Sequence, residues 1–259
     1  EPWASMEGIW LIGIGFLSVV TLAYLALWER MRPRHIGVRV DSPKASALEF
    51  LGGYGLGALL MACAVLSAVL LGGFQVSANF SQASAVAVLR IAAIYVFQAF
   101  GEEVLYRGAA TMCVARRSPA LVAVAVSSVL FSAHHHFNGG YGPVAFVNLA
   151  LLAVLLALTV LRTGRIWMAT AIHASWNFFQ GNVFGVNVSG TEPNPLSSLL
   201  MCKPQDMPYV TGGQMGLEGS LVTTVVLLVF LVIGIIWLWR NPAKTDAGKH
   251  ARHQAPARG

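Results

Sequence analysis

Charged side chains are scarce in this chain of 259 residues. Only 11% of the residues are Asp, Glu, Lys or Arg, whereas a soluble domain has about a quarter. Hydrophobic residues make up 56%, and the mean hydropathy is +0.65. This composition excludes an ordinary soluble domain and indicates a protein that crosses a membrane several times. The net charge of +6 does not indicate nucleic-acid binding, because the basic residues are scattered and form no single stripe.

Cysteine is scarce as well. Cys63, Cys113 and Cys202 are odd in number and far apart, and two of them lie in apolar segments. This spacing fits neither a disulfide framework nor a zinc knuckle. The apolar segment 8–27 is not a secretory signal, because its flank is acidic, the run is about 20 residues long and no small-residue cleavage site follows it.

Long apolar runs fill most of the chain. A helix needs about 20 apolar residues to cross a bilayer, and we expect such helices at 8–28, 47–71, 84–114, 119–136, 143–162, 166–184 and 220–239. The sequence therefore predicts an all-α fold, a polytopic transmembrane bundle of about seven spans. We expect a single transmembrane domain over 1–239 and a polar, disordered tail over 240–259.

The Lys and Arg positions predict the orientation of this bundle. Most of them lie in alternate connections and in the tail, whereas 72–83, 137–142 and 185–219 contain only Lys203. The positive-inside rule then places the N-terminus outside and the tail in the cytoplasm. The long connection 185–219 would either cover the outer mouth of the bundle or serve as a plain connection, and the sequence leaves both open.

Three of the apolar segments carry ionisable or amide side chains. Such groups are costly at membrane depth, and they usually mark a functional site. The three sets are Glu102, Glu103 and Arg107; His134, His135 and His136; and His173 and Asn177. Each set alone could be structural, as an ion pair or a hydrogen bond between helices. Their joint occurrence favours a buried active site.

Helical geometry gives the two adjacent glutamates different tasks. Glu103 and Arg107 are four residues apart and therefore form a natural i,i+4 ion pair. Glu102 is turned by about 100° from Glu103, so it is the carboxylate that stays available for chemistry. It shares a helix face with Gln98 and Tyr106.

The histidines can be assigned to faces in the same way. His135 shares a face with Phe131, and His173 shares one with Asn177, with Gln180 close to the same stripe. A carboxylate, an imidazole and an imidazole–amide pair are the groups needed to activate a water molecule and to stabilise an oxyanion.

These motifs resemble those of the CPBP intramembrane proteases, also called the Abi family. The family patterns EExxxR, FxxxH and HxxxN are matched in order, each in its own apolar segment, by Glu102-Glu103-Val-Leu-Tyr-Arg107, Phe131-Ser-Ala-His-His135 and His173-Ala-Ser-Trp-Asn177. The family includes the CAAX prenyl endopeptidases and proteins of bacteriocin processing or immunity.

The resemblance implies proteolysis inside the membrane. Glu102 would be the general base, and His135 would help to bind or activate the water. His173 and Asn177 would support the tetrahedral oxyanion. The implied substrate is a membrane-embedded or lipidated peptide in the bilayer, with no nucleic acid involved. The implied location is the inner (plasma) membrane of a bacterial cell, which the chain would cross several times.

The resemblance also implies supporting residues and raises the question of a metal. Arg107 would orient the acidic pair that it forms with Glu103. A zinc ion, if bound, would use Glu102, His135 and His173. The chain has no His-Glu-x-x-His helix, and a metal-free glutamate mechanism is equally compatible with these residues; we favour the metal-free mechanism.

Two rival functions come from other classes of protein. A non-catalytic membrane scaffold or bacteriocin immunity protein could use the same fold, but it would have no need to keep all three motifs intact. A proton-coupled transporter could use the same carboxylate and histidines as a relay. Such transporters usually show internal repeats and broken helices in paired positions, and neither is visible here.

The depths of the three motifs conflict with straight, parallel helices. Counted at about 1.5 Å per residue from the inner helix ends at Arg116, Arg117 and Arg165, Glu102 lies about 21 Å deep, His135 about 27 Å and His173 about 12 Å. Tilted helices, an extension of the third helix into the cytosol, or a sixth helix that starts deeper would bring the motifs together. The sequence leaves these three alternatives open.

Overall fold

The computed structural model describes residues 16, 19, 23 and 36–241. The predicted first span 8–28, apart from residues 16, 19 and 23, and all but the first two residues of the predicted tail 240–259 lie outside the described residues. The described part is mostly helical, as predicted. Its α-helices are α2 (Pro43–Leu70), α3 (Ala85–Glu103), α4 (Ala120–His134), α5 (Pro143–Thr163), α6 (Trp167–Phe178), α7 (Pro208–Thr211) and α8 (Leu221–Arg240).

Shorter elements extend or connect these helices. Two π-helical segments continue α3 and α6, namely η2 (Val104–Cys113) and η4 (Phe179–Val183). The 3₁₀ turns are η3 (His135–Phe137), η5 (Pro195–Ser197), η6 (Gly213–Met215) and η7 (Leu217–Gly219). The antiparallel strands β1 (Phe74–Ala78) and β2 (Leu200–Pro204) form a small sheet that the all-α prediction did not contain.

Five helices of the described part are long and apolar enough to cross a membrane. They cover Pro43–Leu70, Ala85–Cys113, Ala120–Phe137, Pro143–Thr163 and Leu221–Arg240, close to five of the predicted spans. The predicted span 166–184 differs, because its α-helix α6 has only 12 residues before it continues as η4. The number of spans and the orientation of the bundle stay predictions.

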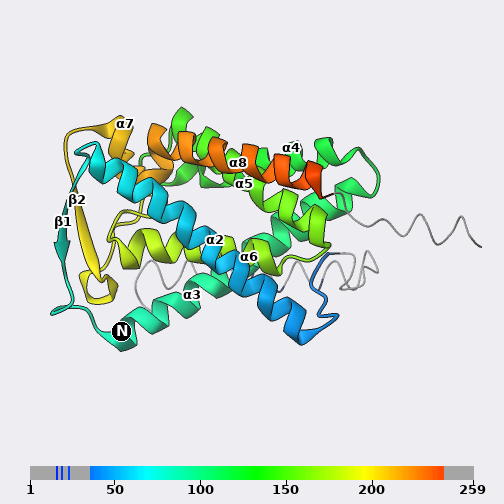
Figure 1. Cartoon of the computed structure of the whole chain (residues 1–259), viewed down its shortest axis with the longest axis horizontal. Helices are drawn as coiled ribbons and strands as arrows, with labels where there is room; N and C mark the ends of the chain where they lie inside the picture. The colour runs from blue at the N-terminus through cyan, green and yellow to red at the C-terminus, as the bar shows by residue number, and fades with distance from the viewer. Residues whose placement is uncertain (1–15, 17–18, 20–22, 24–35, 242–259) are drawn as a thin grey trace, which may run out of the picture.

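The short helix α6 lies at the centre of the bundle. In Figure 1, α2 and α3 slant across one side of α6, and α4, α5 and α8 lie on the other side. Every α6 residue from Ala169 to Asn177 is buried. An apolar helix enclosed in this way packs against protein all round, which explains how a short helix can hold a polar motif inside the bundle.

Glycines let α2 approach α6 closely. A Cβ atom at Gly53 or Gly57 would clash with the α6 backbone, at Met168 and Ile172 respectively. Small residues four apart are the usual way in which membrane helices bring their backbones together. Gly55 lies between them and has open space at its Cβ position, so the close approach is confined to one face of α2.

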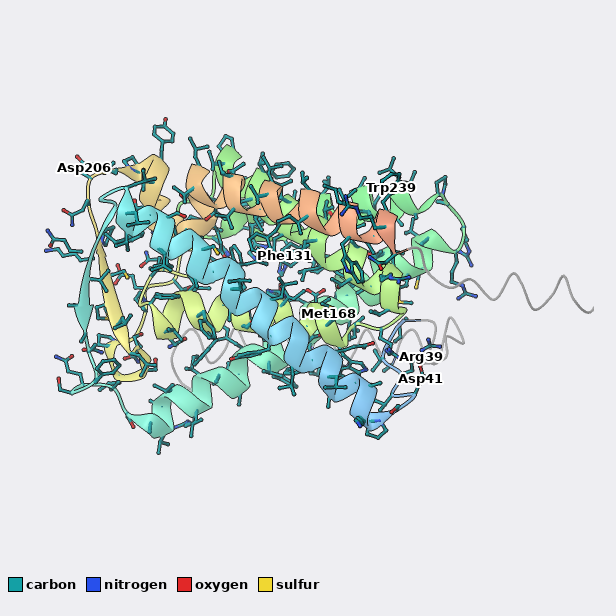
Figure 2. All side chains as sticks on the ribbon, viewed as in Figure 1. Arg39, Asp41, Phe131, Met168, Asp206 and Trp239 are labelled. Carbon is teal, nitrogen blue, oxygen red and sulfur yellow. The ribbon has the colours of Figure 1, made fainter. Side chains whose placement is uncertain are left out.

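Of the three ways in which the motifs could be brought to one depth, the structure shows a tilted helix α3. In Figure 1, α3 slants relative to α6 and α8, which run nearly along the long axis of the molecule. The end of α3 thereby reaches the centre of α6. Figure 2 shows Phe131 near the middle of the bundle, with Arg39 and Asp41 at one end and Asp206 at the other.

Candidate functional site

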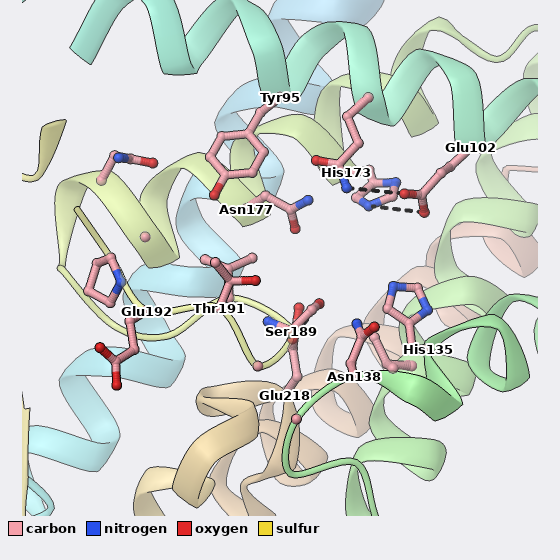
Figure 3. Close-up of a pocket in the computed structure, with 18 of the residues that line it drawn as sticks. Tyr95, Glu102, His135, Asn138, His173, Asn177, Ser189, Thr191, Glu192 and Glu218 are labelled. Atoms are coloured by element: carbon pink, nitrogen blue, oxygen red, sulfur yellow. Dashed lines mark hydrogen bonds and ion pairs between the residues drawn. The ribbon is translucent and has the colours of Figure 1, made fainter. Parts of the chain in front are cut away.

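A cavity of about 530 Å³ lies between α3, the end of α4, α6 and the segment 185–219. The three sequence motifs, which are far apart along the chain, all contribute to its lining (Figure 3). The lining residues from these motifs are Glu102, Phe131, His134, His135, His173 and Asn177. The structure thus brings together the four residues to which the sequence assigned chemistry, and it places Glu103 and Arg107 outside the lining.

Glu102 projects into the cavity from the last turn of α3. Its side chain is almost fully buried. Atom Oε1 accepts a hydrogen bond from Nε2 of Gln98, at 3.1 Å. Atom Oε2 has no hydrogen-bond partner among the described residues. One carboxylate oxygen is therefore held in place while the other is available to a ligand in the cavity.

Glu103 does not line the cavity and pairs with Arg107. The Nη1 atom of Arg107 lies 3.1 Å from Oε1 of Glu103, and both side chains are fully buried. The guanidinium also lies over the Phe131 ring, with Cζ 4.4 Å from the ring centroid, a cation–π contact. The i,i+4 spacing thus produces the expected ion pair, and Phe131 ties this pair to α4.

His173 joins the two glutamates. Its Nδ1 atom lies 3.0 Å from Oε1 of Glu103, and because a carboxylate only accepts, Nδ1 carries the hydrogen. Its Nε2 atom lies 4.0 Å from Oε2 of Glu102. The hydrogen bond between Glu103 and His173 was missed from the sequence, because it joins α3 to α6 and no local spacing indicates it.

His135 presents its second ring nitrogen to the cavity. Its Nδ1 atom lies 2.9 Å from the carbonyl oxygen of Phe131, so Nδ1 donates and Nε2 is left as an acceptor. The Phe131 ring lies between the two imidazoles, with ring centroids 5.0 Å from His135 and 5.6 Å from His173. Of the neighbouring histidines, His134 also lines the cavity and His136 does not.

Asn177 lines the cavity one turn beyond His173, but Gln180 does not. Gln180 instead donates a hydrogen bond to the Asn187 carbonyl. Gln180, predicted close to the His173 stripe, is thus buried beside the cavity and does not line it. The face of His173 and Asn177 continues four residues further on at Gly181, which does line the cavity.

The segment 185–219 forms a wall of the cavity. Residues 188–194 line it together with Ser197 and Glu218. The connection 185–219 therefore covers part of the bundle and is not a plain connection. The sequence motifs did not indicate Glu218. It stands alone as a charged residue in the apolar run 207–239, and this isolation could have marked it as a candidate. Burial raises the pKa of this carboxyl group to about 7.

The cavity residues do not form a ready metal site. Within the part of the chain that the structure describes, no group of three or more His, Cys, Asp or Glu side chains is placed to hold a metal ion. The three ligands expected for a zinc ion were Glu102, His135 and His173. They share the cavity, but they do not converge on one point as a zinc site requires.

One protein-family model matches a central part of the chain. Residues 82–179 match the family model described as type II CAAX prenyl endopeptidase Rce1-like. This segment, which holds all three motifs, is similar to the Rce1-like protease family. The resemblance drawn from the three motifs is thereby confirmed, and the match supports a membrane-bound peptidase. Comparisons with curated proteins and with solved structures give no match.

The Rce1-like segment contains only part of the cavity. It begins just before α3 and ends at the start of η4, so it includes Glu102, His135, His173 and Asn177. The cavity wall formed by 188–194 and Glu218 lies outside it.

Proposed function

We propose that the chain is an intramembrane endopeptidase that hydrolyses a peptide bond with a water molecule activated by Glu102. One observation carries the proposal. The Oε2 atom of Glu102, which has no hydrogen-bond partner in the described part of the chain, faces Nε2 of His173 across 4.0 Å in a cavity lined by all three motifs. A water molecule bound to a buried carboxylate is a suitable nucleophile for a peptide carbonyl.

Glu102 acts as the general base. Gln98 fixes Oε1, so Oε2 takes the proton as the water oxygen attacks the carbonyl carbon. Nε2 of His135 accepts the second hydrogen of the water and orients it, because Nδ1 is already bound to the Phe131 carbonyl. When the tetrahedral intermediate collapses, the protonated Glu102 returns its proton to the leaving amine.

His173 and Asn177 stabilise the oxyanion. A carboxylate bound to Nδ1 favours the doubly protonated imidazole, and Glu103 occupies that position at 3.0 Å. The Nε2 atom then also carries a hydrogen, and it can donate to the oxyanion. The amide of Asn177 supplies a second donor from the next turn of α6.

The substrate that fits this site is a membrane-embedded or lipidated peptide. The cavity is reached within a bundle whose helices carry many exposed large apolar side chains, so the peptide must partition into the bilayer to meet it. We infer a bacterial plasma membrane as the location from the resemblance to the CPBP family, which includes proteins of bacteriocin processing.

The test compares the membranes of cells that carry wild-type protein or Glu102→Gln. New N-termini in membrane proteins or lipidated peptides, identified by mass spectrometry, should appear only with the wild type. Asp206→Asn is the control, because Asp206 is exposed and does not line the cavity; it should give the wild-type set. Identical N-termini with Glu102→Gln would support a non-catalytic scaffold or immunity protein.

A further inference from the structure

A tight turn forms the cavity wall opposite Glu102. Val188 and Thr191 exchange two backbone hydrogen bonds, each of 2.9 Å. The two residues between them, Ser189 and Gly190, have φ of +47° and +88°. Two successive positive φ angles define a type I′ turn. Ser189 is the only residue other than glycine with positive φ in the described part of the chain, and this backbone conformation is unfavourable for serine.

Glu218 holds Ser189 in this conformation. Its Oε2 atom accepts hydrogen bonds from the backbone N–H of Ser189, at 2.6 Å, and from the Ser189 hydroxyl, at 2.8 Å. Glu218 is only 2% exposed, so these bonds do not compete with bulk water. Two bonds to one carboxylate are strong enough to offset the strain of a single residue.

The other side of the turn is packed against the end of the histidine segment. A Cβ atom at Gly190 would lie 2.6 Å from both the N and the O atom of Gly139. Gly139 follows His135 by four residues and also lines the cavity. The turn is therefore held between Gly139 and Glu218, and without Glu218 only the long bond from the Gly190 N–H to the Met215 carbonyl, at 3.4 Å, would remain on that side.

The backbone of Glu218 is itself fixed by two long helices. The side-chain amide of Asn148, on α5, donates to the carbonyls of Glu218 and Ser220, at 2.8 and 2.7 Å. Thr224, on α8, donates its hydroxyl to Oδ1 of Asn148, at 2.6 Å. The carboxylate is thus presented to Ser189 from a rigid support and not from a free loop.

We propose that Glu218 is a positioning residue that locks the turn 188–191 in place as the substrate-facing wall of the catalytic cavity. Figure 3 shows Ser189 and Glu218 across the cavity from Glu102 and His173. Glu218 acts on the substrate only through the turn. This inference rests on the proposed peptidase function, since it assumes that a peptide occupies the cavity.

The test uses the full-length protein in detergent or nanodiscs, with a cleaved peptide found by the membrane comparison above. Two quantities are measured: kcat/KM, and amide hydrogen exchange of the peptide 186–192 by mass spectrometry. Glu218→Ala should lower kcat/KM about tenfold or more, mainly through a higher KM, and should accelerate exchange in 186–192. Glu218→Gln, which keeps an acceptor oxygen of the same size, should lie between Glu218→Ala and the wild type.

A second substitution separates positioning from catalysis. Glycine favours positive φ, so Ser189→Gly combined with Glu218→Ala should regain slow exchange and part of the lost kcat/KM. A catalytic carboxylate could not be replaced in this way. Asp206→Asn serves again as the control, with wild-type values for both quantities.

Three results would overturn the proposal. These are wild-type exchange in Glu218→Ala, loss of activity in Glu218→Ala with exchange in 186–192 unchanged, and failure of Ser189→Gly to restore slow exchange. If Glu218→Ala does not fold, the same comparison is made with Glu218→Gln. If the wild type cleaves nothing, the proposed function fails, while the exchange measurements still decide whether Glu218 locks the turn.

Discussion

His173 binds Glu103 with one ring nitrogen and faces Glu102 with the other. The distances are 3.0 Å from Nδ1 to Glu103 and 4.0 Å from Nε2 to Glu102. Two glutamates that are adjacent in sequence therefore act on the same imidazole from two sides. Glu103 keeps a hydrogen on Nδ1 and orients the ring, as a carboxylate does for metal-bound and catalytic histidines, and Glu102 shares the cavity with it.

Replacing Glu103 should harm stability as well as activity. Glu103→Gln leaves Arg107 fully buried without its anionic partner, and breaking a buried pair costs about 3–5 kcal/mol. It also weakens the hold on His173, so the cleavage rate should fall. Thermal unfolding in detergent and activity below the transition measure both effects. A variant that is fully stable yet wholly inactive would reverse the roles assigned to Glu102 and Glu103.

Among the three successive histidines, substitution of His135 should reduce cleavage most. His135→Asn removes the Nε2 acceptor in the cavity, and cleavage should fall by roughly 10²-fold or more. His136→Asn is the matched control, because His136 does not line the cavity, and it should stay close to the wild type. His134 lines the cavity as well, so a smaller loss is expected there. Equal losses at His135 and His136 would contradict the assignment.

Stability should depend on pH through Glu218. Burial raises the pKa of this group to about 7 from its ordinary value of 4.5, so the folded protein binds the proton more tightly than the unfolded chain. The associated stability is fully present below about pH 4.5 and is lost as the pH rises through about 7. The melting temperature of the wild type should therefore fall over this range relative to that of Glu218→Gln.

A second variant checks the origin of this dependence. The Ser189 hydroxyl lowers the pKa of Glu218 by donating a hydrogen bond to it. Ser189→Ala should therefore move the midpoint of the pH dependence upward. Identical pH profiles for the wild type and Glu218→Gln would show that Glu218 does not titrate in this range.

The contact between α2 and α6 should tolerate no side chain at Gly57. Gly57→Ala places a Cβ against the Ile172 carbonyl and the Ser175 hydroxyl, and overpacking of this kind costs about 1–3 kcal/mol. Gly55→Ala is the matched control, because its Cβ meets nothing within 4 Å and alanine is the better helix former. Thermal unfolding compares the two. A more stable Gly57→Ala would mean that α2 and α6 are not in close contact.

The orientation of the bundle can be measured with single cysteines. In a variant without Cys63, Cys113 and Cys202, Asp206→Cys should react with a membrane-impermeant thiol reagent on intact cells. Lys44→Cys should react only after permeabilisation, because the positive-inside rule places it in the cytoplasm. Both positions are exposed. The opposite labelling would invert the bundle.

The sequence predicted those parts of the fold and site that depend on neighbours along the chain. Hydropathy placed five helices within a few residues of their observed positions. The i,i+4 rule gave the pair of Glu103 and Arg107 and separated Glu102 from it. Both rest on short-range geometry that a single helix already determines.

Contacts between distant segments could not be predicted in this way. The bond from Glu103 to His173 depends on the tilt of α3, and the bond from Glu218 to Ser189 depends on how the segment 185–219 folds back. The bond from Gln180 to the Asn187 carbonyl likewise depends on how the chain folds back after η4.

The enclosure of α6 has a consequence for how the protein responds to its lipids. Helices that touch lipid change their tilt when the thickness of the hydrocarbon layer changes, and α2, α3 and α8 carry exposed large apolar residues along their length. The residues of α6 from Ala169 to Asn177 are buried and do not meet acyl chains. A change in bilayer thickness can therefore displace His173 and Asn177 only by moving the surrounding helices. The tilt of α3, which carries Glu102, is the most important of these movements.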